Sequence, residues 1–291
     1  MSLTRAFRSG LVGAAALALT LGVSATASAQ AADPNPGNLT FTGNIDFVNQ
    51  YMFRGIRQNS SGMAIWPSGD LGLALYSGEG GLKSAAINFG TWNSQLSDTA
   101  QNAEGKLWYE SDFYSTLSLG FGGGASVAAT YTAYTSPNNS FTTVKEIMFK
   151  IAEDDSALLG KASLKPYVAM GFEFDTKPGA GQADGGDHAG KYLELGVSPG
   201  YAASKASLTV PIKVGLSMGD YYEMPGTGVD STFGYFSTAA IVTVPIGGTT
   251  NFGSWNVHGG VEFQKLGDTT AFFNGDKDTQ VIYSGGIGFT Y

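Results

Sequence analysis

Residues 39–54 read LTFTGNIDFVNQYMFR, and this stretch decides the fold class. Its odd-numbered positions are mostly apolar and include several aromatic residues, while its even-numbered positions are mostly polar. Alternation with a period of two predicts a β-strand that has one apolar and one polar face. The run is much longer than the roughly 5–6 residues of an ordinary strand. It is long enough for the roughly 9–11 residues with which a strand crosses a membrane. We therefore predict a membrane-spanning strand over 39–54.

The same design recurs along the rest of the chain. Similar alternation predicts strands over 63–76, 82–92, 107–119, 125–135, 141–151, 162–175, 191–201, 206–218, 232–246, 254–265 and 279–291. Long polar connections (93–106, 176–190, 219–231 and 266–278) mostly alternate with short turns, so the long ones are expected at one end. Outer-membrane barrels sort their loops in this way. The sequence thus predicts an all-β fold, a transmembrane antiparallel up-and-down β-barrel of about twelve strands.

Composition fits this prediction without requiring it. Charged residues make up 14% of the chain, against about 25% in soluble domains. The chain has 42 glycines and no cysteine, which excludes disulfides and thiolate chemistry. A secreted β-sandwich could share this composition. The prediction of a barrel therefore rests on the strand length and on the order of the loops.

The N-terminal residues have the layout of a secretory signal peptide. Arg5 and Arg8 precede an apolar run over 11–23, and Ala27-Ser28-Ala29 then forms a small-residue cleavage site. We predict a signal peptide over 1–29, a short lead-in over 30–38 and a barrel over 39–291. Removing two of the 16 basic residues leaves 14 against 24 acidic ones, which changes the net charge from −8 to −10. That charge argues against a nucleic-acid partner.

The last predicted strand ends with Ile287, Phe289 and Tyr291 on one face. A terminal aromatic residue on a final amphipathic strand is similar to the recognition signal that outer-membrane proteins present to their barrel-assembly machinery. Phe289 and Tyr291 are therefore the expected assembly signal, and the bacterial outer membrane is the expected location.

Residues 51–58, YMFRGIRQ, resemble the Y-x-F-R-G-x-x-Q segment of the family of TorF-like porins. The segment lies near the mature N-terminus in both cases, although Arg57 departs from the small polar residue expected there. The resemblance implies an outer-membrane protein of Gram-negative bacteria with pore activity.

If the apolar faces meet lipid, the ionisable residues of the other faces line the lumen. This set is Asp46, Arg54, Asp70, Glu110, Asp112, Lys165, Glu173, Glu194, Lys213, His258 and Glu262. Acids outnumber bases, so a pore would prefer cations or neutral polar solutes. Alternatively, these charges pair across a filled barrel. Arg54 could face Glu110 or Asp112 at a constriction, but we favour a structural role in which it pairs with one acid and anchors the loop 55–62.

Enzymatic and metal-binding functions have little support in the sequence. Some barrels of this size are lipases, and His258 and His188 are the available bases, but no G-x-S-x-G motif is present. Asp184, Asp187, His188, Asp276 and Asp278 lie in loops without the spacing of a calcium loop. We expect neither catalysis, nor a cofactor, nor a metal ion.

The sequence thus predicts an outer-membrane channel for passive diffusion of small polar solutes. The alternatives are a closed structural or adhesive barrel that acts through its loops and, less favoured, a lipid-modifying enzyme. Expected partners are outer-membrane lipid, the assembly machinery and small polar solutes, and a homo-oligomer is compatible with the sequence.

Overall fold

The computed structural model describes residues 37–59, 61–98, 106–174, 183–184, 186, 188–250 and 253–291, and these form a closed antiparallel β-barrel. The predicted signal peptide and most of the lead-in lie outside these residues. The twelve wall strands found in the described residues are β1 (Leu39–Val48), β4 (Ala64–Ser77), β5 (Leu82–Leu96), β6 (Trp108–Phe121), β7 (Ala125–Thr135), β8 (Val144–Glu153), β9 (Tyr167–Phe174), β10 (Lys191–Val197), β13 (Ile212–Gly219), β16 (Phe233–Thr250), β17 (Gly253–Leu266) and β18 (Thr279–Thr290).

Each wall strand pairs with the strands before and after it, as the up-and-down prediction requires. The barrel closes where β1 pairs with β18, in a register that sets Ile45 opposite Ile287. Backbone hydrogen bonds between Phe41 and Tyr291 extend this seam at the chain end. Closure gives each of the twelve described wall strands a neighbour on both sides, which is a requirement for strands that cross lipid.

The two faces of the strands have the predicted chemistry. Large apolar side chains point outward and are exposed, as with Phe47, Leu71, Phe113 and Ile287. The residues between them point into the barrel and include most of the buried polar side chains. The predicted first strand is too long, however, because β1 ends at Val48. Tyr51 and Phe53 do not continue its outward face but are buried, with exposures of 0% and 1%.

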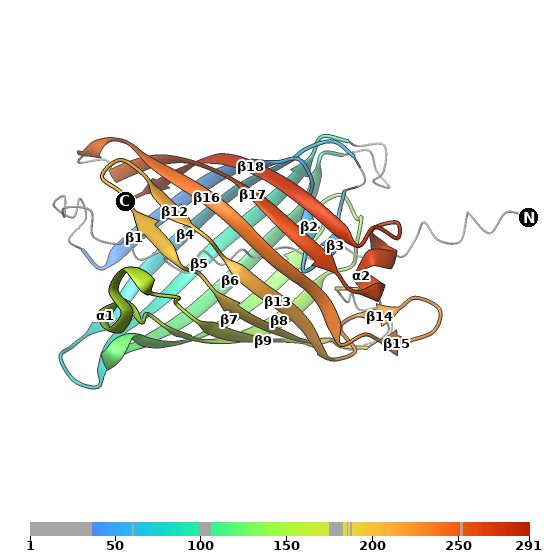
Figure 1. Cartoon of the computed structure of the whole chain (residues 1–291), viewed down its shortest axis with the longest axis horizontal. Helices are drawn as coiled ribbons and strands as arrows, with labels where there is room; N and C mark the ends of the chain where they lie inside the picture. The colour runs from blue at the N-terminus through green and yellow to red at the C-terminus, as the bar shows by residue number, and fades with distance from the viewer. Residues whose placement is uncertain are drawn as a thin grey trace, which may run out of the picture.

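The connections 220–232 and 267–278 lie at one end of the barrel, here called the loop end (Figure 1). This end carries the short pairs β2 (Met52–Phe53) with β3 (Ile56–Arg57) and β14 (Glu223–Met224) with β15 (Val229–Asp230), together with helix α2 (Asp268–Phe273). The C-terminus lies at the opposite end (Figure 1). Among the described residues, no helix is both long and apolar enough to span a bilayer.

The opposite end carries the 3-10 turn η2 (Gly122–Gly124), helix α1 (Ser156–Leu159) and turn η3 (Gly160–Ala162). Asp155 organises the α1 connection, because its carboxylate accepts hydrogen bonds from the Ser163 hydroxyl and from the amides of Leu164 and Lys165. Lys165 was predicted on a wall strand. It lies instead in this connection with a positive φ of 50°, before β9 begins at Tyr167. Its predicted place on a wall strand is therefore wrong, and its role in lining the lumen stays a prediction.

Two further short strands, β11 (Gly200–Ala202) and β12 (Ser207–Thr209), extend the wall beyond β10 and β13. Pro199 separates β10 from β11, and Pro211 separates β12 from β13. Proline has no amide hydrogen for the ladder, which explains why the predicted continuous strands 191–201 and 206–218 are interrupted at these residues.

Candidate functional site

The segment that follows β1 turns into the barrel and forms a hairpin, here called the plug hairpin (residues 51–58). Strands β2 and β3 pair Met52 with Arg57 and Phe53 with Ile56. The two residues between them, Arg54 and Gly55, both have positive φ angles, 45° and 83°. Positive φ at both central positions is the geometry of a tight type I′ hairpin turn. The motif YMFRGIRQ therefore folds as one compact unit.

Tyr51 fixes the base of the plug hairpin to the barrel wall. Its hydroxyl donates a hydrogen bond to Glu110 Oε2 at 2.8 Å, and its amide donates to Asn59 Oδ1 at 2.6 Å. Its ring packs against Trp66 and Trp92 with centroid distances of 5.3 and 5.4 Å. Contacts between aromatic rings of this kind contribute about 0.5–1.5 kcal/mol each beyond their buried area.

Arg54 fixes the tip. Its guanidinium donates to both carboxylate oxygens of Glu146 on β8, from Nη1 at 2.6 Å and from Nη2 at 2.8 Å. Nη1 also donates to the Tyr221 hydroxyl at 2.6 Å, and the guanidinium carbon lies 4.0 Å from the centroid of the Tyr192 ring. The Arg54 and Glu146 side chains are 8% and 2% exposed. A buried, two-point ion pair of this kind sets orientation, because either charge alone would be costly to bury.

The backbone of the turn is held as well. The Tyr222 hydroxyl donates to the Arg54 carbonyl at 3.0 Å, and the Asn274 amide donates to the Gly55 carbonyl at 2.8 Å. A Cβ at Gly55 would lie 3.1 Å from Tyr235 Cβ and 3.2 Å from Thr270 Cγ2. The turn therefore requires glycine for its backbone angle and for its close approach to the wall.

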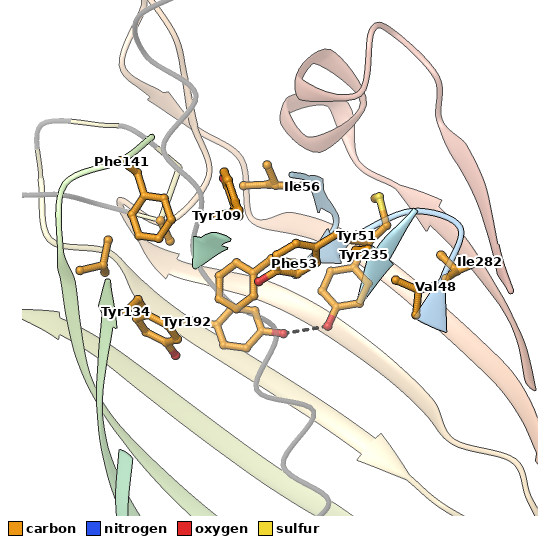
Figure 2. Close-up of a cluster of buried hydrophobic side chains, with 14 of the residues drawn as sticks. Val48, Tyr51, Phe53, Ile56, Tyr109, Tyr134, Phe141, Tyr192, Tyr235 and Ile282 are labelled. Atoms are coloured by element: carbon orange, nitrogen blue, oxygen red, sulfur yellow. Dashed lines mark hydrogen bonds between the residues drawn. The ribbon is translucent and has the colours of Figure 1, made fainter. Parts of the chain in front are cut away.

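Side chains from strands around the barrel surround the hairpin (Figure 2). Figure 2 shows Phe53 and Tyr51 between opposite walls, with a hydrogen bond of 3.0 Å between the Tyr192 and Tyr235 hydroxyls. The buried cluster includes Val48, Trp92, Tyr109, Tyr134, Tyr192, Tyr235 and Ile282 from the wall. The plug hairpin and this cluster thus occupy the lumen at the loop end.

Further from the loop end, polar groups that face inward stay in contact with solvent. His258 Nε2 lies 2.6 Å from Asp46 Oδ1, and Lys213 Nζ lies 4.0 Å from Glu194 Oε2. The side chains of these four residues are between 18% and 31% exposed. An ionisable side chain inside a barrel is stable when it is wet or paired, and these are both.

Tyrosine hydroxyls surround Glu194. The carboxylate accepts hydrogen bonds from Tyr167 and Tyr192 at 2.7 Å and from Tyr235 at 2.9 Å. Because Tyr192 also stacks on Arg54, this group connects the wet part of the lumen to the tip of the plug hairpin.

The other predicted lumen residues fall into two groups. Asp70 accepts a hydrogen bond from Asn88, and Glu262 accepts bonds from Ser237 and Gln264, all on wall strands. Glu110 and Asp112 are fully buried beside Tyr51, and Glu173 accepts hydrogen bonds from the amides of Ala183 and Gly190. Arg54 pairs with Glu146, and not with Glu110 or Asp112.

Sequence reasoning missed two charged residues of β8 that face inward, Glu146 and Lys150. The phase of 141–151 is confused by Lys145, which shares the outward face of Ile147 and Phe149. Alternation over 147–151 alone would have placed Glu146 and Lys150 inside. Lys150 Nζ lies 4.2 Å from the ring centroid of Tyr167, close to the group around Glu194.

His258 does not face a serine in the contacts described. Its two ring nitrogens lie 2.6 Å from Asp46 and 2.9 Å from Asn256.

The Phe289 ring packs between Phe41 and Trp255, with centroid distances of 6.1 and 4.7 Å, at the barrel seam. Its proposed role and that of Tyr291 in assembly stay predictions.

Solved structures that resemble the chain include several outer-membrane proteins. An outer-membrane channel from Pseudomonas putida F1 is 11% identical, with 88% of this chain and 97% of that chain covered and a TM-score of 0.46. Outer membrane phospholipase A from Escherichia coli is 12% identical; the alignment covers 85% of this chain and 89% of the phospholipase chain, with a TM-score of 0.42. The β domain of the Bordetella autotransporter BrkA is 10% identical, with 88% and 99% covered and a TM-score of 0.42.

No curated protein matches the chain. One family model does, over residues 30–217, and it does not name the TorF-like porins, so that resemblance stays a prediction. Since the match covers more than half of the sequence, the chain belongs to the family described as "Bacterial protein of unknown function (Gcw_chp)".

Proposed function

We propose that this protein is an outer-membrane channel for small polar solutes, and that the plug hairpin closes its loop end. The observation that carries the proposal is the contrast along the lumen. Asp46, His258, Lys213 and Glu194 are partly exposed inside the barrel, whereas Arg54 and the aromatic cluster around it are buried. Wet, charged walls belong to a water-filled passage, and a filled mouth makes that passage conditional on movement of the hairpin.

The acidic balance of the inward face supports a preference for cations. The wall strands carry four of the proposed lumen acids, Asp46, Asp70, Glu194 and Glu262, but only two lysines among the inward residues discussed, Lys150 and Lys213. Fixed negative charge in a narrow passage attracts cations and repels anions. The proposed solutes are therefore small cations and neutral polar molecules, which cross by passive diffusion.

The plug hairpin also gives a reason to consider the alternative, a permanently closed barrel that acts through its loops. The two functions differ in conductance. Refolded protein in a planar bilayer under a KCl gradient should show discrete steps and a reversal potential on the cation side. Arg54→Met should increase the frequency of the steps, because it releases the tip of the hairpin. Folded barrels of both proteins without any steps would refute the channel and leave the closed barrel. That the chain is not an enzyme stays a prediction.

A further inference from the structure

Two loops at the loop end bring together ligands that are far apart in the sequence. His188 precedes β10, whereas Asp220 and Glu223 lie in the connection that begins after β13. One ligand atom from each of the three residues lies within 4.8 Å of the others. His188 Nδ1 and Glu223 Oε1 are 3.0 Å apart. One imidazole and two carboxylates from these two loops thus lie close together, and none of them belongs to the plug hairpin.

Glu223 supplies an independent indication that a ligand belongs there. Its side chain is 7% exposed, yet its Oε2 has no hydrogen-bond partner. A buried carboxylate oxygen without a partner has lost its hydration without gaining a hydrogen bond in return, which is unfavourable. A bound cation would remove this cost, whereas a solvated surface cluster would not have it.

A third carboxylate, that of Asp184, lies directly beside Glu223. Asp184 Oδ2 accepts a hydrogen bond from the Glu223 amide at 2.7 Å. A Cβ built at Gly186 would lie 2.3 Å from Glu223 Oε2 and 2.9 Å from Asp184 Oδ1, so the two carboxylates face the same glycine. The carboxylates of Asp184 and Glu223 therefore lie close together beside the same backbone segment.

We propose that His188, Asp220 and Glu223 bind a divalent transition-metal ion of the zinc class, with Asp184 beside them. Ligand atoms about 2.0–2.2 Å from a tetrahedral zinc ion lie about 3.4 Å from one another. The ligand atoms here lie within 4.8 Å of one another, so side-chain rotations that move them by about 1 Å would close the site. One imidazole nitrogen among carboxylate oxygens suits zinc better than calcium, which prefers oxygen ligands alone.

The position of the site links it to the plug hairpin. Asp220 and Glu223 bracket Tyr221 and Tyr222, the two residues that hold the side chain and the carbonyl of Arg54. A metal ion on the bracketing residues would fix the loop that carries both tyrosines. Binding itself does not depend on the proposed channel function, and it is tested separately.

The test is a calorimetric titration of untagged, refolded protein in detergent with Zn²⁺ and, in parallel, with Ca²⁺. We expect one Zn²⁺ per chain and weaker Ca²⁺ binding. His188→Ala and Glu223→Gln should each weaken Zn²⁺ binding at least tenfold. Glu79→Gln, which changes an exposed acid at the opposite end, and His258→Gln, which removes the other imidazole, should leave it unchanged.

Three results would overturn the proposal. The first is a wild-type protein without saturable Zn²⁺ binding, and the second is tighter binding of Ca²⁺ than of Zn²⁺. The third is an affinity within twofold of wild type in either ligand variant. Heat-dependent migration in gels reports whether each variant has folded. If Glu223→Gln does not fold, Asp220→Asn replaces it, because asparagine tolerates the φ of 56° at that position.

Discussion

The ion pair between Arg54 and Glu146 permits a quantitative test of the plug hairpin. Arg54→Met leaves the Glu146 carboxylate buried without its cation, and Glu146→Met leaves the Arg54 guanidinium without its anion. Removing one partner of a buried pair costs about 3–5 kcal/mol. Since each 1.4 kcal/mol is a factor of ten, the fraction of barrels with a displaced hairpin should rise roughly 100- to 4,000-fold.

The double variant makes the test specific. Replacing both members of a buried ion pair with apolar residues of similar size is often neutral or stabilising. Arg54→Met combined with Glu146→Met should therefore return most of the way to the closed state, although the Tyr221 hydroxyl loses the Arg54 donor as well. Lys83→Met, which breaks an exposed pair with Glu79, is the matched control and should change nothing.

The assay is the open probability of single barrels in a planar bilayer, with trypsin cleavage after Arg57 in the refolded protein as a second readout. Both quantities should rise in each single variant and fall again in the double variant. The reasoning is refuted if folded Arg54→Met and Glu146→Met barrels keep the wild-type open probability and cleavage rate. It is also refuted if the double variant is more open than either single variant.

Three further predictions follow from the same structure. Gly55→Ala should destabilise the hairpin by about 1–2 kcal/mol because of its positive φ, and should speed tryptic cleavage, whereas Gly80→Ala, with open space around it, should not. Lys213→Glu should increase the ratio of cation to anion permeability measured from reversal potentials. Lys83→Glu, at the exposed start of β5, should not. Hydrogen bonds, first from a serine hydroxyl and then from backbone amides, hold the pKa of Asp155 below its usual value. The stability that these bonds give is therefore present above the ordinary pKa of about 4 and is lost as the pH falls through the lowered pKa. Hydrogen-exchange protection of the Leu164 and Lys165 amides should decrease in that pH range. The decrease should be much smaller in Asp155→Asn.

Local pattern was enough to predict the barrel wall. Alternation with a period of two depends only on which side of a strand meets lipid, so Phe47 and Ile287 could be placed outside without knowledge of any partner. The same rule placed Asp46, Glu194 and Lys213 inside. It was less reliable where the pattern is mixed, as on β8, where Lys145 concealed the inward position of Glu146.

The plug hairpin could not be predicted in this way. Its residues alternate like those of β1, and only the tertiary structure shows that the chain leaves the wall after Val48 and enters the lumen. The reason is that its stability comes from partners distant in the sequence: Arg54 binds Glu146, 92 residues away, and Tyr221, 167 residues away. The sequence by itself determined a barrel wall with an apolar outer face and a polar inner face, because strand periodicity is local. The tertiary structure decided which connection fills that interior and which loops meet above it, because both depend on contacts formed only when the barrel closes.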